Sequence, residues 1–169
     1  DLDVEEEAED YEKALKKYQE AQKKLAAERE KAQKKAEQDA EKAYRAELST
    51  RRSAEDAQLA LIDDENQKKQ IKINLQYSRQ IEDLKHTLKT QKDLTEVARE
   101  NINATIAALE QQQTNELIKI EEERYSKELE LQKKAIELKL QTVKEGSEEE
   151  KNLLLQQNEI AKEIAMLKA

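Results

Sequence analysis

The stretch QTVKEGSEEEKN, residues 141–152, holds the only glycine of a 169-residue chain that has no proline. Gly146 follows a lysine and a glutamate. This order is typical of a helix C-terminus, because glycine adopts the left-handed conformation without a Cβ clash and lysine suits the negative end of the helix dipole. Ser147 and Glu150 have the spacing of a capping box, which predicts that a new helix begins there.

A connection of one or two residues between helices most simply gives an αα-hairpin. We therefore predict a turn at Gly146–Ser147 and a short helix over residues 148–169 that returns along the preceding helix. The alternative is a kink inside one continuous helix, where a glycine costs about 1 kcal/mol relative to alanine.

The rest of the chain has the composition of long helices. Charged residues make up 41% of it, hydrophobic residues make up 36%, and the five aromatic residues are all tyrosines. These are too few large apolar side chains for a sizeable core, whereas the abundance of Ala, Glu, Lys, Gln and Leu favours helix over disorder. The predicted fold class is all-α, with a long coiled-coil helix or helices that end in the C-terminal αα-hairpin.

Composition also limits the classes of partner. The net charge of -8 opposes nucleic-acid binding, which needs a basic face. The longest apolar runs, at residues 59–62 and 153–155, are much shorter than the roughly 20 residues of a membrane span, so no membrane segment is expected. The N-terminus is acidic, unlike a signal peptide, which indicates a mature cytosolic chain or a fragment of a longer one. The absence of an initiator methionine favours the fragment.

Apolar residues recur at alternating steps of three and four along most of the chain, as in a heptad helix. We predict a charged amphipathic helix over residues 1–48, a candidate kink at 49–56, a long coiled-coil helix over 57–145, the turn at 146–147 and a returning helix over 148–169. The residues expected to pack between helices are Tyr11, Leu15, Tyr18, Leu25, Ile81, Leu84, Leu88, Ile102, Leu109, Leu129, Ile136, Leu140, Val143, Leu153, Ile160, Ile164 and Leu167.

The segment before the hairpin turn carries two apolar stripes. Leu129, Ile136 and Leu140 belong to one stripe, and Leu131 and Leu138 form a second stripe beside it. A face of this width is suited to packing against more than one neighbour.

Polar residues interrupt the stripe in the middle of the chain. Gln91, Thr95, Thr105 and Gln112 fall on predicted seam positions, where polar groups lower stability and narrow the choice of register. We therefore expect weak and specific association of this portion.

No group of residues predicts catalysis. His86 is the single histidine and there is no cysteine, so a zinc site or a histidine-based triad cannot be assembled within the chain. Neighbouring carboxylates, as at residues 63–65 and 148–150, point around a helix instead of converging on a cation. A thin helical rod also offers no water-excluding pocket, so we expect no enzymatic activity, no cofactor and no metal.

Two segments resemble helical parts of tail tape measure proteins of phages and prophages from Bacteroides-like hosts. They read AYRAELSTRRSAEDAQLALIDDENQKKQIKINL from residue 43 and NELIKIEEERYSKELELQKKAIELKLQTVKEGSEEEKNLLLQQNEIAKEIAMLK from residue 115, and the likeness covers about residues 40–169. The shared features are Lys/Glu/Gln-rich helices, a pattern that here reads AQLALIDDE, and a VKEGSEEE-type turn before a leucine-rich helix. The Gly-rich apolar segment that members of the family often carry is not present in this chain.

The resemblance implies a structural role. Several copies would bundle inside the tail tube, and the length of the protein would set the length of the tail. The chain would then be cytoplasmic during assembly and part of the virion tail afterwards, with itself or other helical proteins as partners.

The residues leave two other functions open. The first is a coiled-coil adaptor or scaffold whose hairpin end, residues 117–169, binds a partner protein through its broad apolar face. The second is a helical spacer between domains, which the ion pairs of residues 1–48 favour.

Overall fold

The computed structural model describes residues 2–169 and contains four helices in this range. They are α1 (Leu2–Ala60), α2 (Glu65–Thr90), α3 (Glu96–Thr142) and α4 (Glu148–Lys168). Two compact units divide the chain, residues 1–58 and residues 59–169. The predicted all-α fold class is therefore confirmed.

Helix α1 is a single helix of 59 residues in which no side chain is buried. Residues 49–56, the candidate kink, are helical throughout. Acid–base pairs four residues apart stabilise the helix along its surface, and three of them are Glu30–Lys34 at 3.4 Å, Glu41–Arg45 at 2.9 Å and Arg51–Glu55 at 3.7 Å. Pairs of this kind each contribute about 0.2–0.5 kcal/mol to an isolated helix.

The long helix predicted over residues 57–145 is wrong, because turns interrupt it at residues 61–64 and 91–95. Each turn ends in a side-chain cap at the start of the next helix. The Asp64 carboxylate accepts a hydrogen bond from the backbone N–H of Gln67 at 2.8 Å, and the Thr95 hydroxyl accepts one from that of Ala98 at 3.1 Å. Such caps satisfy N–H groups that have no intrahelical partner, so a helix can begin there without a preceding glycine or proline.

The turn at residue 146 differs in detail from the prediction. Helix α3 ends at Thr142, and its C-cap, Val143, is extended. The Lys144 carbonyl then accepts a hydrogen bond from the Ser147 N–H at 3.2 Å, which closes a β-turn with Gly146 in the third position at φ 79°. A positive φ at that position strongly favours glycine. Gly146 is thus required by the β-turn and does not terminate the helix itself.

The predicted capping box at the start of α4 is present. The Ser147 hydroxyl accepts a hydrogen bond from the Glu150 N–H at 3.1 Å, and the Glu150 carboxylate accepts one from the Gly146 N–H at 3.5 Å. Three glutamates occupy the first turn of α4, where the helix dipole favours negative charge. These contacts turn the chain back, and α4 packs on α3 as the predicted αα-hairpin.

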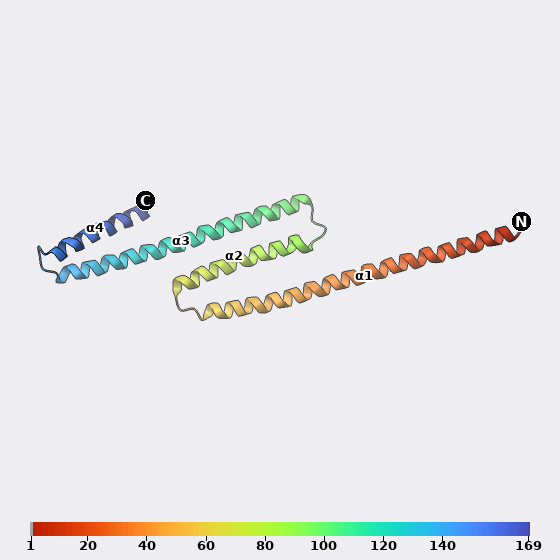
Figure 1. Ribbon diagram of the computed structural model, residues 1–169, viewed down its shortest axis with the longest axis horizontal. Coiled ribbons are helices and arrows are strands. Elements are labelled where there is room, and N and C mark those ends of the chain that lie inside the picture. Colours follow the sequence, from red (N-terminus) through yellow and green to blue (C-terminus); the bar gives the residue numbers. More distant parts are fainter. Residues whose placement is uncertain (1) are drawn as a thin grey trace. The chain divides into compact units, whose positions relative to one another are not determined.

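Helix α3 is the central element of residues 59–169. It packs with α2 on one side and with α4 on the other (Figure 1). Its buried residues explain the arrangement, because Leu129 follows Ile120 by nine positions, a rotation of about 180° around a helix of 3.6 residues per turn. The first half of α3 therefore faces α2, and the second half faces α4.

Candidate helix–helix interface

The buried side chains of residues 59–169 form two narrow apolar seams. Tyr77, Ile81, Ile106 and Ile120 are buried on α2 and the first half of α3. Leu129, Ile136 and Leu153 are buried on the second half of α3 and on α4. All seven are hydrophobic, and no polar or charged residue is buried among the described residues. Apolar burial is thus the main force that holds each pair of helices together.

Polar contacts cross the α2–α3 seam and define its register. The Tyr77 hydroxyl donates a hydrogen bond to the Glu116 carboxylate at 2.8 Å. The Gln113 side-chain amide donates one to the Asn74 amide oxygen at 2.9 Å. A shift of α2 along α3 would break both hydrogen bonds. The two bonds therefore favour the observed alignment of the helices over shifted alignments.

Arg99 holds the end of α2 against the start of α3. Its guanidinium donates to the backbone carbonyls of Leu88 at 3.3 Å and Gln91 at 3.5 Å. The last carbonyls of a helix have no intrahelical partner, so the arginine satisfies groups that would otherwise need water. The cationic side chain also suits the negative end of the α2 dipole.

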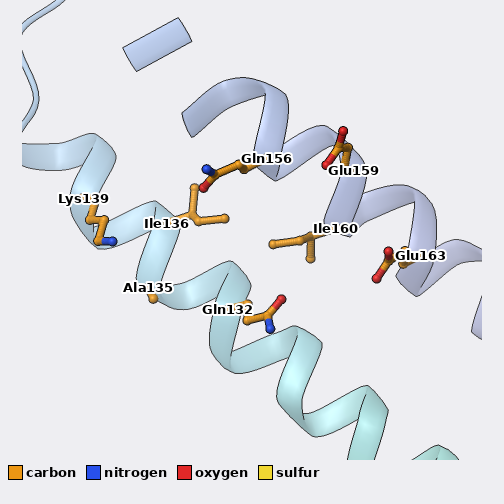
Figure 2. Close-up of a pocket in the computed structure, with 8 residues that line it drawn as sticks. All are labelled: Gln132, Ala135, Ile136, Lys139, Gln156, Glu159, Ile160 and Glu163. Atoms are coloured by element: carbon orange, nitrogen blue, oxygen red, sulfur yellow. The ribbon is translucent and has the colours of Figure 1, made fainter. Parts of the chain in front are cut away.

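The α3–α4 seam has the same construction. Leu129 is its most buried residue, and the Tyr125 hydroxyl donates a hydrogen bond to the Glu163 carboxylate at 2.8 Å. Figure 2 shows Ile136 of α3 and Ile160 of α4 pointing toward each other. A groove of about 380 Å³ runs beside them, lined by Gln132, Ile136 and Lys139 of α3 and by Gln156, Glu159 and Ile160 of α4. Charged and amide groups at the rim surround an apolar centre, as expected for two packed helices.

Hydrogen bonds across the seams raise the pKa values of two tyrosines, whereas a hydrogen bond within α3 lowers the pKa of a glutamate. The bond to Glu116 raises the pKa of Tyr77, and the bond to Glu163 raises the pKa of Tyr125, because an ionised phenol can no longer donate. The hydrogen bond from Arg124 lowers the pKa of Glu121.

We expect the stability of residues 59–169 to fall at high pH. A phenol whose folded pKa is raised adds stability that is fully present below its ordinary pKa of 10.0 and is lost as the pH rises through the folded value. The thermal midpoint, followed by circular dichroism from pH 8 to pH 11, should therefore drop above about pH 10. The thermal midpoint of the double variant Tyr77→Phe/Tyr125→Phe should drop less than that of the unmodified chain. An equal drop in both proteins would mean that the two tyrosines do not cause the loss of stability. Tyr11→Phe, on exposed α1, is the matched control.

The structure places the predicted interface residues in three environments. Ile81, Leu129, Ile136 and Leu153 are buried. Half-buried positions along the same seams are Leu84, Leu88, Ile102, Leu109, Leu140, Val143, Ile160 and Ile164. Exposed positions are Leu167 at the end of α4 and the four residues of α1, Tyr11, Leu15, Tyr18 and Leu25. The four α1 side chains are therefore accessible to solvent.

The polar residues expected on the seam have other roles. Gln91 is the C-cap of α2 and Thr95 is the N-cap of α3. Thr105 and Gln112 are exposed on α3, and the Thr105 hydroxyl donates to the carbonyl of Asn101. For Gln91 and Thr95 the expectation failed because a seam position inside an unbroken helix becomes a cap position once the helix turns.

Three buried residues were not on the predicted interface list: Tyr77, Ile106 and Ile120. Tyr77 lay on the heptad pattern, and Ile120 lies two heptads after Ile106, with the polar Gln113 at the position between them. The caps at Asp64 and Thr95 were also missed, although D-x-x-Q at Asp64–Gln67 has nearly the spacing of a capping box and could have identified the start of α2.

Comparisons with protein-family models, with curated proteins and with solved structures give no match to this chain. Over residues 2–169, no helix is long and apolar enough to cross a membrane. The same residues contain no group of three or more His, Cys, Asp or Glu side chains positioned to hold a metal ion.

Proposed function

We propose that this chain is a non-enzymatic structural protein that associates with copies of itself or with other helical proteins through α1. The observation that carries the proposal is the exposed apolar stripe of α1, in which Tyr11, Leu15, Tyr18 and Leu25 recur at heptad spacing and Tyr11 is 70% exposed. A helix that bears such a stripe without covering it is suited to pack against another helix.

The more specific form of this proposal is a segment of a phage tail tape measure protein, the family that the sequence resembles. A molecular ruler needs a constant rise per residue, which an α-helix supplies at about 1.5 Å. The 59 residues of α1 would contribute roughly 90 Å at this rise. In the hairpins the chain doubles back, so α2, α3 and α4 add less length per residue than α1.

Replacement of Leu15 and Tyr18 by glutamate should weaken self-association. Each charge would fall on the proposed seam, and removing apolar burial from both copies should raise the dissociation constant by about 100-fold or more. Sedimentation equilibrium of the full chain over a wide concentration range measures this constant, and circular dichroism at the same concentrations follows helix content.

The matched control is Lys13→Gln/Lys17→Gln, which changes the net charge by the same amount on the opposite side of α1. We expect the control to associate like the unmodified chain. A full chain that remains a helical monomer at every concentration would reject self-association and favour the spacer function.

An adaptor function has its own supporting observation. Leu131 and Leu138 are 67% and 64% exposed on the second half of α3, on the side away from α4. Binding of a partner protein there would be unaffected by the α1 variants. Leu131→Glu/Leu138→Glu should abolish such binding and leave the α1-dependent association unchanged.

A further inference from the structure

The turn between α2 and α3 is built from residues that also suit a helix. Residues 91–95 read QKDLT and contain neither glycine nor proline. The turn is closed by the Thr95 cap, by the backbone bond from Gln91 N–H to the Thr87 carbonyl at 3.0 Å, and by Arg99. By contrast, Gly146 at φ 79° holds the next turn in a conformation that a helix does not contain.

The apolar stripe of α2 continues into α3 without a change of phase. Leu84, Leu88, Gln91, Thr95, Ala98 and Ile102 are separated by steps of four, three, four, three and four. This is the spacing of one unbroken heptad helix, although the chain reverses direction in the middle of it. A straight helix through residues 91–95 would therefore keep the seams of α2 and α3 on one face.

The side-chain contacts across the hairpin are centred near the turn. The contacting pairs Asn74–Gln113, Gln70–Glu121 and Tyr77–Glu116 have midpoints between residues 93 and 97. If the helix were straight, a two-fold axis in this region would bring the α2 half of one copy beside the α3 half of the other. The same interface would then form between two chains instead of within one.

We propose that the α2–α3 hairpin exchanges with a second copy of this chain. Residues 91–95 become helical, residues 65–142 form one helix, and two such helices pack antiparallel with the hairpin contacts now made between chains. Exchange keeps the buried seam and the Tyr77–Glu116 bond, and it changes the backbone of only five residues. Gln91 and Thr95 then lie on the seam near the two-fold axis, where polar groups favour a single register.

The inference does not rest on the function proposed for α1. Association through α1 can occur with every hairpin closed, and exchange needs no contact of α1. A distance measured within one chain separates the two cases, because only exchange moves α2 away from its own α3.

Two spin labels test the exchange in the full chain. The chain has no cysteine, so Ser78→Cys and Ala108→Cys, both at exposed positions, supply the only thiols. The labels are 30 residues apart, roughly 45 Å along a straight helix, whereas packed helix axes lie about 10 Å apart in the hairpin. Labelled chain is diluted tenfold with unlabelled chain, so that distances within one chain dominate the double electron–electron resonance signal.

We expect the monomer fraction to give the short distance and the dimer fraction to give the long one. Thr95→Ala removes the cap of the closed turn and should tighten the dimer about 25-fold, about fivefold from each chain. Thr105→Ala is the matched control, because this hydroxyl lies on the same helix and bonds only within it. Asp93→Gly/Leu94→Gly favours the turn and should remove the long distance.

The proposal is overturned if the dimer fraction keeps the short distance, or if Thr95→Ala tightens the dimer no more than Thr105→Ala does. A dimer with the short distance that also depends on Leu15 and Tyr18 would reject exchange and leave the proposed role of α1 intact.

Discussion

Replacement of Leu129 by alanine is expected to lower the free energy of unfolding of residues 59–169 by about 3 kcal/mol. Leu129 is 2% exposed, the lowest value among the buried residues, and it lies on the face of α3 that packs against α4. Truncation removes apolar contacts from the seam and leaves a void that two helices can close only in part. Because most helical stability in proteins comes from packing and α4 packs only on α3, its helicity should be lost first.

The matched control is Leu131→Ala, two residues along the same helix, where the side chain is 67% exposed. This change should alter stability by less than about 0.5 kcal/mol, because little apolar surface is withdrawn from water at that position. Urea unfolding followed by circular dichroism, at a concentration where the chain is monomeric, gives both values. Equal effects of the two variants would show that α4 does not cover the Leu129 face.

Replacement of Ile120 by alanine should lower the free energy of unfolding by about 2–3 kcal/mol. Ile120 is 7% exposed and is the last buried residue of the α3 face that packs against α2. Its loss should weaken the seam where α2 begins. Amide hydrogen exchange should therefore show reduced protection of α2 while α4 keeps its own.

Ile118→Ala is the control for this prediction, because Ile118 has the same side chain and is 51% exposed. We expect its effect to stay below about 1 kcal/mol. The Ile120 and Leu129 variants differ in which helix loses protection, so they test directly whether α3 uses opposite faces for its two neighbours. Loss of protection in both helices from either variant would mean that α2 and α4 unfold as one unit.

Much of the local structure followed from residue chemistry. Ser147, Glu150 and Gly146 predicted the position and direction of the last turn, because a capping box and a left-handed glycine act within a few residues of chain. The heptad positions of Ile81, Leu129 and Leu153 likewise predicted side chains that are buried. These features depend on neighbours in sequence, so a single chain is sufficient to find them.

The turn at residues 91–95 could not be found in the same way. Its residues suit a helix, and the heptad spacing passes through them unchanged, so a straight helix and a hairpin satisfy the same local preferences. A hairpin becomes favourable when α2 buries Tyr77 and Ile81 against Ile106 and Ile120 on the other helix, and that gain depends on residues 25 or more positions apart.

The pattern of residues was therefore enough to establish that this protein is helical, amphipathic and reversed at Gly146. It could not establish which apolar stripe of α3 would be covered. Leu131 and Leu138 match Leu129 and Ile136 in hydrophobicity and spacing, yet only the second pair is buried. The physical reason is that a helix covers the face its neighbour reaches, and the short turn at 143–147 brings α4 to the Leu129 side.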